Sequence, residues 1–115
     1  MNALDTVAQP GTPAVSGAYA DENGETLALH LADGSAVTIT AETLWRECPS
    51  AQGKARRFKG QATPPPGVRI TAVNAIGHYA INIAFSDGHD RGIYPWEYLL
   101  ALARRPKPED FIIAS

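Results

Sequence analysis

The sequence predicts an α+β domain in two layers: a small, mostly antiparallel sheet built from two ββα-like units, with two helices packed on it. Three observations support this fold class. Apolar and polar residues alternate in several short stretches, as in half-buried strands. After each set of stretches, apolar residues recur at helical spacing. The length of 115 residues is that of one domain, and a hydrophobic content of 44% excludes a fully disordered chain.

The first unit is predicted between residues 26 and 48. Leucines alternate with other residues in 26–31, and the alternation resumes in 35–40, so both stretches are predicted strands. Asp33-Gly34 between them is typical of a two-residue type I′ turn. A helix over 41–48 should follow, with Thr40 as its N-cap and Pro49 marking its end.

The second unit is predicted between residues 68 and 104. Strands are expected over 68–75, where the alternation breaks near Ala72 and indicates a bulge, and over 78–85, where it is regular. A short strand at 93–94 then leads to Pro95, which suits the first position of a helix. That helix should end at the arginines 104 and 105, before Pro106.

The remaining segments are predicted to lack regular structure. Residues 1–24 are rich in glycine, proline and small residues, which predicts a disordered tail before a single domain at 25–105, and 106–115 form a second tail. Residues 49–67 are predicted to be a long connection, because the triple proline at 64–66 favours extended backbone.

Charge and cysteine content limit the partners and the compartment. A net charge of −2 creates no general attraction to nucleic acid or to anionic membranes, and the apolar runs are too short for a membrane span. The N-terminal residues lack the basic and apolar regions of a signal peptide. The single cysteine, Cys48, excludes an internal disulfide and fits a reducing compartment, so we expect a cytoplasmic protein.

A basic run within the long connection is one candidate contact surface. Five cationic residues and one aromatic could bind phosphates or a single nucleic-acid strand, but the negative net charge favours an acidic protein surface, and an ordinary solvated face is the simplest interpretation. The residues are Lys54, Arg56, Arg57, Phe58 and Lys59 within the connection, with Arg46 nearby before it.

The other chemically interesting residues are Cys48 and the stretch Asp87-Gly88-His89-Asp90. Zinc needs about four ligands, and this chain has one cysteine and three scattered histidines, so a buried structural cysteine is the simpler interpretation. The acidic turn could bind a metal or transfer protons, yet the same residues make an ordinary turn. No glycine-rich phosphate loop or nucleophile elbow occurs, so no catalytic residue is predicted.

Three stretches, 44–51, 76–80 and 85–99, are similar to the gamma-butyrobetaine hydroxylase N-terminal domain family. The likeness covers roughly residues 25–104, and its most specific part is Asp-Gly-His-x-x-Gly-Ile-Tyr-x-Trp-x-Tyr-Leu, which begins at Asp87. In that family the domain precedes the oxygenase domain of carnitine-pathway hydroxylases, is appended to P-loop ATPases with iron–sulfur clusters, or stands alone in small bacterial proteins. The length here resembles the stand-alone group.

The resemblance also implies a zinc site and its loss. The hydroxylase domains bind zinc through a Cys-x-Cys-x-x-Cys run and the histidine of the Asp-Gly-His motif. These positions correspond to Cys48, Ser50, Gly53 and His89, of which only the first and last keep metal-binding side chains. We therefore expect no zinc and no other cofactor, with Cys48 and His89 lying near each other as remnants of the site.

These considerations predict a non-catalytic binding or adaptor module. The resemblance suggests a protein partner in iron–sulfur or metal-cofactor handling, such as an iron–sulfur cluster carrier, and neither nucleic acid nor membrane is expected to bind. The alternatives are a metal-binding protein with a degenerate zinc-type site at Cys48 and His89, or a small enzyme, although the oxygenase domain of the related hydroxylases is absent. The candidate interaction residues are Arg46, Lys54, Arg56, Arg57, Lys59, Asp87, His89 and Asp90.

Overall fold

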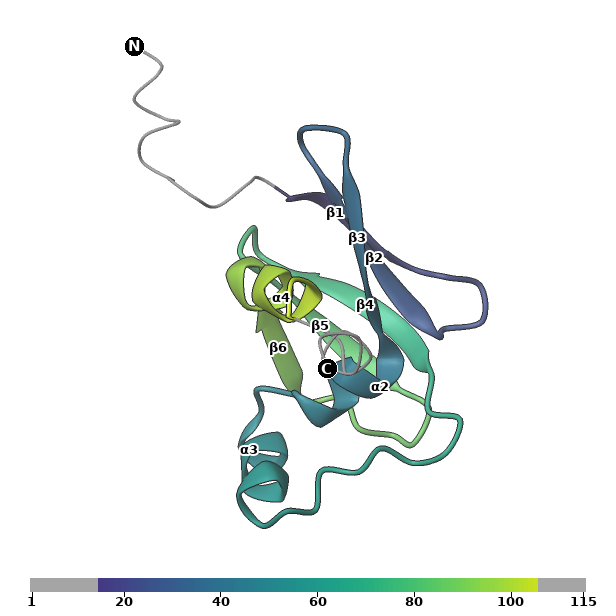
Figure 1. Cartoon of the computed structure of the whole chain (residues 1–115), viewed down its shortest axis with the longest axis vertical. Coiled ribbons are helices and arrows are strands. Elements are labelled where there is room, and N and C mark those ends of the chain that lie inside the picture. The colour runs from purple at the N-terminus through teal and green to yellow at the C-terminus, as the bar shows by residue number, and fades with distance from the viewer. Residues whose placement is uncertain (1–14, 106–115) are drawn as a thin grey trace, which may run out of the picture.

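Two three-stranded antiparallel sheets and three helices form the fold in the computed structural model, which describes residues 15–105 (Figure 1). The α+β class is therefore confirmed, but the chain builds two small sheets where one was predicted, and three helices where two were predicted. Among the described residues, no helix has the length and apolar character needed to cross a membrane.

The first sheet has the order β1-β2-β3 and is followed by a helix. Its strands are β1 (Val15–Ala20), β2 (Thr26–Leu31) and β3 (Ala36–Thr40), and α2 (Ala41–Arg46) follows directly. Thr40 is the N-cap of α2, as predicted, because its hydroxyl accepts a hydrogen bond from the Thr43 amide. The helix ends at Arg46, two residues earlier than the sequence indicated.

The second sheet repeats this arrangement. Its order is β4-β5-β6, with β4 (Ile70–Ile76), β5 (Ala80–Phe85) and β6 (Gly92–Pro95), and it is followed by α4 (Trp96–Ala103). The predicted bulge is present as a register shift between Ile70 and Ala72. Pro95 is the last residue of β6 and the N-cap of α4. The sequence predicted it one position further on, as the first residue of the helix. Tyr79 falls within the strand predicted over 78–85, but it lies in the β4–β5 turn and is 61% exposed.

The two halves of the fold, β1 to α2 and β4 to α4, also share the turn that joins their second and third strands. Leu31 N donates to Ser35 O, and Phe85 N donates to His89 O. In each turn the aspartate (Asp33 or Asp87) accepts a hydrogen bond from the amide two residues later. Only the glycine of each turn has a positive φ, so the first turn is not the predicted type I′, which needs a positive φ at both central residues. Ser35 and His89 therefore occupy matching positions.

Strand β1 corrects the prediction of a disordered tail over residues 1–24. Residues 15–20 pair with β2, and Asp21 stabilises the following turn by accepting a hydrogen bond from the Glu25 amide. Alanine, serine and glycine give this strand little apolar signal of its own, so its pairing with the leucine-rich β2 decides its conformation. Residues 1–14 and the predicted C-terminal tail at 106–115 lie outside the described residues.

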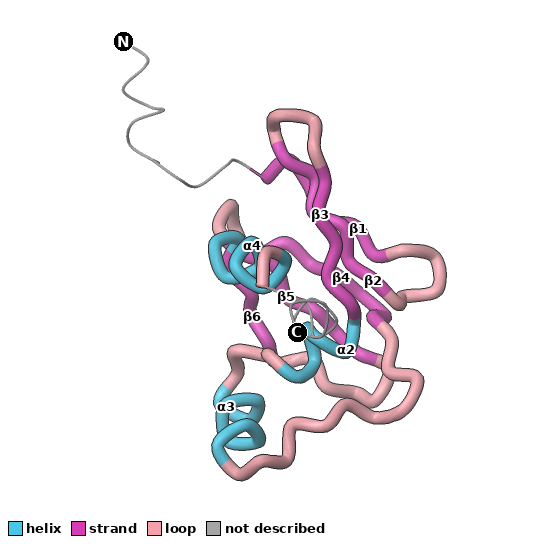
Figure 2. The backbone as a smooth tube through the Cα atoms, viewed as in Figure 1, coloured by secondary structure: helices cyan, strands magenta, loops and turns pink. Residues whose placement is uncertain are grey.

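Helix α3 (Ala51–Phe58) corrects the prediction of a long unstructured connection over 49–67. Ser50 caps the helix by accepting a hydrogen bond from the Gly53 amide at 3.0 Å. Alanine, glutamine, lysine and arginine favour helix, but they form no apolar face, so the periodicity test missed it. Within the predicted connection, residues 49–50 and 59–67 lack helix and strand (Figure 2).

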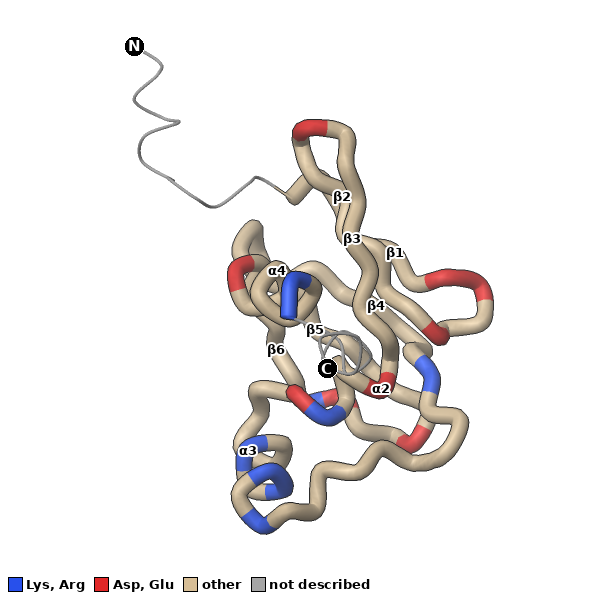
Figure 3. The backbone as a smooth tube through the Cα atoms, viewed as in Figure 1, with Lys and Arg blue, Asp and Glu red and all other residues tan. Residues whose placement is uncertain are grey.

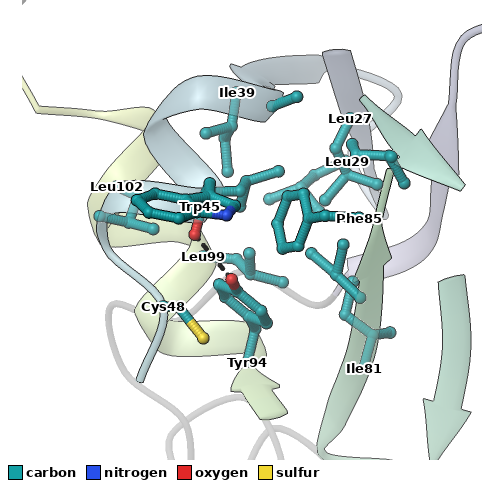
Figure 4. Packing of buried hydrophobic residues seen from close by; sticks show 14 of the residues in the cluster. Leu27, Leu29, Ile39, Trp45, Cys48, Ile81, Phe85, Tyr94, Leu99 and Leu102 are labelled. Atoms are coloured by element: carbon teal, nitrogen blue, oxygen red, sulfur yellow. Dashed lines mark hydrogen bonds between the residues drawn. The ribbon is translucent and has the colours of Figure 1, made fainter. Parts of the chain in front are cut away.

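The hydrophobic core joins the two sheets to α2 and α4 (Figure 4). It draws on both halves in similar measure, which means that neither half has a separate core. Its fully or almost fully buried members include Leu27, Leu29, Ile39, Leu44, Trp45, Ile81, Ile83, Phe85, Tyr94, Leu99 and Leu102.

One polar contact within this core offers a test of how the halves are joined. The Tyr94 hydroxyl is fully buried and donates to Leu44 O at 2.6 Å. Tyr94→Phe should lower the free energy of unfolding by about 1–2 kcal/mol, because it leaves a buried carbonyl without its partner. Urea denaturation measures the change. Tyr79→Phe, at an exposed position, is the control and should change it by less than about 0.5 kcal/mol. Equal stability of the two variants would contradict the prediction.

Candidate functional site

The structure brings Cys48 and His89 into contact although they are 41 residues apart in sequence. His89 Nε2 lies 3.0 Å from Cys48 Sγ. Cys48 is 0% exposed and His89 is 6% exposed, which is unusual for a histidine in so small a domain. The two side chains are therefore neighbours, as the family resemblance led us to expect.

Local structure on both sides of the contact determines its geometry. Cys48 comes two residues after the end of α2, where its amide still bonds to Trp45 O. His89 lies in the β5–β6 turn, where its carbonyl accepts a hydrogen bond from the Phe85 amide. Asp87 in that turn accepts hydrogen bonds from the His89 amide through Oδ1 and from Trp45 Nε1 through Oδ2, at 3.1 and 2.9 Å. The aspartate thus connects the turn that carries the imidazole to the helix that precedes the thiol.

Aromatic rings and a glycine surround the pair. The His89 ring stacks on Phe85 with a centroid separation of 6.0 Å, and Trp45 lies tilted at 6.2 Å. At Gly92, a Cβ atom would lie only 2.6 Å from Cys48 Sγ, so a larger residue there would displace the thiol. The thiol therefore lies in a closely packed space with no room for a bulky side chain from β6.

The electrostatic environment keeps the imidazole neutral. Burial, and then the charge of Arg56, lower the pKa of His89, while Asp87 and Asp90 act in the opposite direction. Burial raises the pKa of Asp87, but its hydrogen bonds from the His89 amide and the Trp45 indole outweigh that effect, and the net pKa is lowered. An anionic Asp87 thus lies next to a neutral His89.

Helix α3 closes the site from a third side. The Cys48 thiol donates to Ser50 Oγ at 3.3 Å, and a His89 protonated at Nε2 then donates to the sulfur. Arg57 Nη1 donates to Cys48 O at 2.8 Å and to Arg46 O at 2.9 Å. The two hydrogen bonds from Arg57 satisfy backbone carbonyls at the end of α2 and just after it.

Arg56 completes this side by packing on an aromatic ring. Its guanidinium lies 4.4 Å from the centre of the Trp45 ring, which is a cation–π contact. Its Nη1 is buried without a hydrogen-bond partner. The side chain therefore contributes mainly by covering the indole.

These residues do not fit a tetrahedral zinc ion. A structural zinc site takes four ligands, usually thiolates and imidazoles. Only Cys48 and His89 supply such groups here, since Ser50 offers a neutral hydroxyl and Gly53 has no side chain. Within residues 15–105, no group of three or more histidine, cysteine, aspartate or glutamate side chains is placed to hold a metal ion.

The predicted interaction residues fall into two groups in the structure. Half-buried Arg56 and Arg57, buried His89 and hydrogen-bonded Asp87 are engaged within the fold. The members that are exposed and not bound to other parts of the fold in this way are Arg46, Lys54, Lys59 and Asp90, whereas Asp87 is exposed but hydrogen-bonded to Trp45.

Phe58, the aromatic residue of the predicted basic run, is the most exposed large apolar side chain among the described residues, at 91%. It ends α3, around which lysine and arginine gather (Figure 3). In the sequence, the exposure of Phe58 was indicated by its place inside a run of cations, in a segment that has no apolar face.

Two surface grooves lie away from the Cys48–His89 pair. One, of about 600 Å³, runs between the end of β1, the turn at 21–24 and the start of β4. The other, of about 330 Å³, lies between the start of α2 and residues 67–69. Neither is lined by Cys48 or His89.

Comparison with known proteins gives a family match and similar solved structures. The family model described as gamma-butyrobetaine hydroxylase-like, N-terminal, matches residues 19–100. A crystal structure of a protein of unknown function from Acidithiobacillus ferrooxidans, described as belonging to the DUF971 family, is 33% identical with a TM-score of 0.64, and the match covers 82% of this chain and 94% of that one.

Two solution structures determined by NMR are also similar. One is 29% identical with a TM-score of 0.66, over 92% of this chain and 82% of the other. The second is 28% identical with a TM-score of 0.61, over 90% of this chain and 81% of the other. The search of curated proteins found no matching relative.

The environment of His89 predicts a pH-dependent stability. Because its folded-state pKa lies below the unfolded value, the unfolded chain binds a proton that the folded chain does not, as the pH falls. The stabilisation is complete above the unfolded pKa of about 6.5 and should be lost as the pH falls below it. The free energy of unfolding, measured by denaturation at pH 7 and at pH 5, should therefore decrease less for His89→Ser than for the unchanged chain. Gln52→Ala should retain the original dependence, and equal slopes for His89→Ser and the unchanged chain would refute the prediction.

Proposed function

We propose that the chain, which belongs to the gamma-butyrobetaine hydroxylase-like N-terminal domain family, is a non-catalytic module that binds an acidic protein partner through α3. One observation carries the proposal. Phe58 is 91% exposed at the end of a helix whose charged residues are all cationic. An exposed aromatic side chain surrounded by charges of one sign is the pattern of a contact surface that a partner covers.

The contact surface is smaller than the basic run of the sequence. We call Arg46, Lys54, Phe58 and Lys59 the basic helix surface, because all four are exposed. Arg56 and Arg57 lie between them in sequence but are bound to Trp45 and to backbone carbonyls. The charges free to meet a partner are therefore those of Arg46 and the two lysines, with Phe58 as the apolar anchor.

Charge complementarity favours an acidic protein segment with an apolar residue as the partner. The chain as a whole has a net charge of −2, so this surface is locally opposite to the rest of the molecule. The acidic side chains Asp21 and Glu22 lie in the β1–β2 turn, away from α3 (Figure 3). A single aromatic side chain provides little of the successive base stacking on which single-stranded nucleic acid binding depends.

The buried pair supports a role without catalysis. Cys48 has no exposed surface, and His89 and Asp87 are engaged in contacts that hold the turn and the end of α2 together. A nucleophile and a base would need access to a substrate. Because of the family resemblance, iron–sulfur cluster carriers are the first class of partner to test.

Photo-crosslinking from position 58 tests the proposal. A benzoylphenylalanine in place of Phe58, introduced into the full chain in its native host, should crosslink to a defined protein through an acidic peptide that mass spectrometry identifies. Lys54→Glu combined with Lys59→Glu should reduce the yield about tenfold or more, since close opposite charges across an interface contribute strongly to binding. Added salt should reduce it as well.

The same photoreactive group in place of exposed Tyr79 is the matched control, because that position lies in the β4–β5 turn rather than on α3. Identical crosslinked proteins from both positions, or crosslinks from position 58 to nucleic acid, would contradict the proposal. A yield that does not respond to the lysine substitutions would do so too.

A further inference from the structure

The four positions that correspond to the family's zinc ligands are closed against one another in this chain. We infer that Cys48, Ser50, Gly53 and His89 form a metal-free latch that fixes α3 on the core, and that its closure removes the room for four ligands. This concerns the position of α3 and does not depend on the identity of any partner. The Cys48 latch, as we call these four residues, rests on three separate contacts.

The first contact is the distance between sulfur and nitrogen. Ordinary Zn–S and Zn–N bond lengths of about 2.3 and 2.05 Å, at a tetrahedral angle, would hold Sγ and Nε2 about 3.6 Å apart. The observed separation is 3.0 Å, which is that of a direct hydrogen bond. Cys48 and His89 are therefore closer than a shared tetrahedral ion would place them, and they are joined to each other directly.

The second contact is the packing of Gly53 against Cys48. A Cβ atom at Gly53 would lie 2.3 Å from Cys48 O and 3.0 Å from Cys48 Cβ. The nearest of these is a backbone atom, which cannot rotate away as a flexible side chain could. Any side chain at position 53, including a cysteine, would therefore push the first turn of α3 away from Cys48.

The third contact is the use of the Ser50 hydroxyl. It accepts from the Gly53 amide as the N-cap of α3 and from the Cys48 thiol. A hydroxyl at this position thus starts the helix and contacts the sulfur at the same time. Arg57, from the last turn of α3, adds its hydrogen bond to Cys48 O. Both ends of α3 are consequently held by the residue that would be the first zinc ligand.

The inference that the four positions leave no room for a zinc ion can be tested by placing cysteines at positions 50 and 53. The untagged full chain and its Ser50→Cys/Gly53→Cys variant are incubated with excess zinc under reducing conditions, desalted, and analysed for bound metal. We expect far less than one zinc per chain in both, although the variant carries three cysteines and a histidine. One retained zinc per chain in either protein, with a melting temperature that falls on adding a chelator, would overturn the inference.

A second experiment decides the matter if the double variant does not fold. Gly53→Ala adds only the one methyl group that the closure excludes, and Gln52→Ala is the matched control on the exposed side of the same helix. Gly53→Ala should lower the melting temperature by about 5 °C, as expected for a modest packing defect in a domain of this size. It should also speed hydrogen exchange of the α3 amides about tenfold. If Gly53→Ala and Gln52→Ala behave alike, the inference is wrong.

Discussion

Almost every residue of the stretch 44–48, at the end of α2, forms a side-chain contact with the second half of the chain. The packing of the two halves on each other depends on these contacts. Side chains from β6, from α4 and the residues just after it, and from the β5–β6 turn pair with its polar groups. The contacts are Tyr94 to Leu44 O, Asp87 to the Trp45 indole, Tyr98 to Glu47 O, Arg105 to the Glu47 carboxylate, and His89 to Cys48. Because α2 is only six residues long, these tertiary contacts rather than its own hydrogen bonds stabilise its end.

The two halves follow the same order of three antiparallel strands and a helix, but the turn that they share makes different contacts in each half. Ser35 ends the first turn at the surface, and its hydroxyl bonds back to Asp33. His89 ends the second turn, and its ring enters the core. Both turns share these backbone hydrogen bonds and a glycine with a positive φ, but only the second turn contacts the other half, through His89 on Cys48 and through Asp87 on the Trp45 indole. Helix α3 is the element without a counterpart, and it covers this contact.

The arginines of α3 show how one short segment can serve both stability and surface chemistry. Arg56 and Arg57 turn toward the body of the protein, where a planar guanidinium can stack on an indole or bond to two carbonyls. The lysines, with flexible stems and compact charges, stay in solvent at the outside of the helix. Phe58 remains exposed because the helix is already attached through its arginines and through Gly53 and Ser50. The docking of α3 on the core thus leaves Lys54, Phe58 and Lys59 facing solvent.

The sequence by itself determined the elements whose signal is local. Alternating leucines marked β2 with its observed bounds, the Thr40 cap marked the start of α2, and the broken alternation near Ala72 marked the bulge in β4. The family motif also identified Cys48 and His89 as positions that belong together, although no spacing in the sequence could supply the distance between them.

Only the tertiary structure decided the rest, because the deciding interactions join residues far apart in the chain. Strand β1 exists because β2 offers it a paired edge, and α3 docks through arginines and a glycine rather than through an apolar face that periodicity could reveal. Which cations remain free on α3, and whether Cys48 and His89 leave space between them or close it, depend on packing to within a few tenths of an ångström. Residue type and spacing carry no information at that precision.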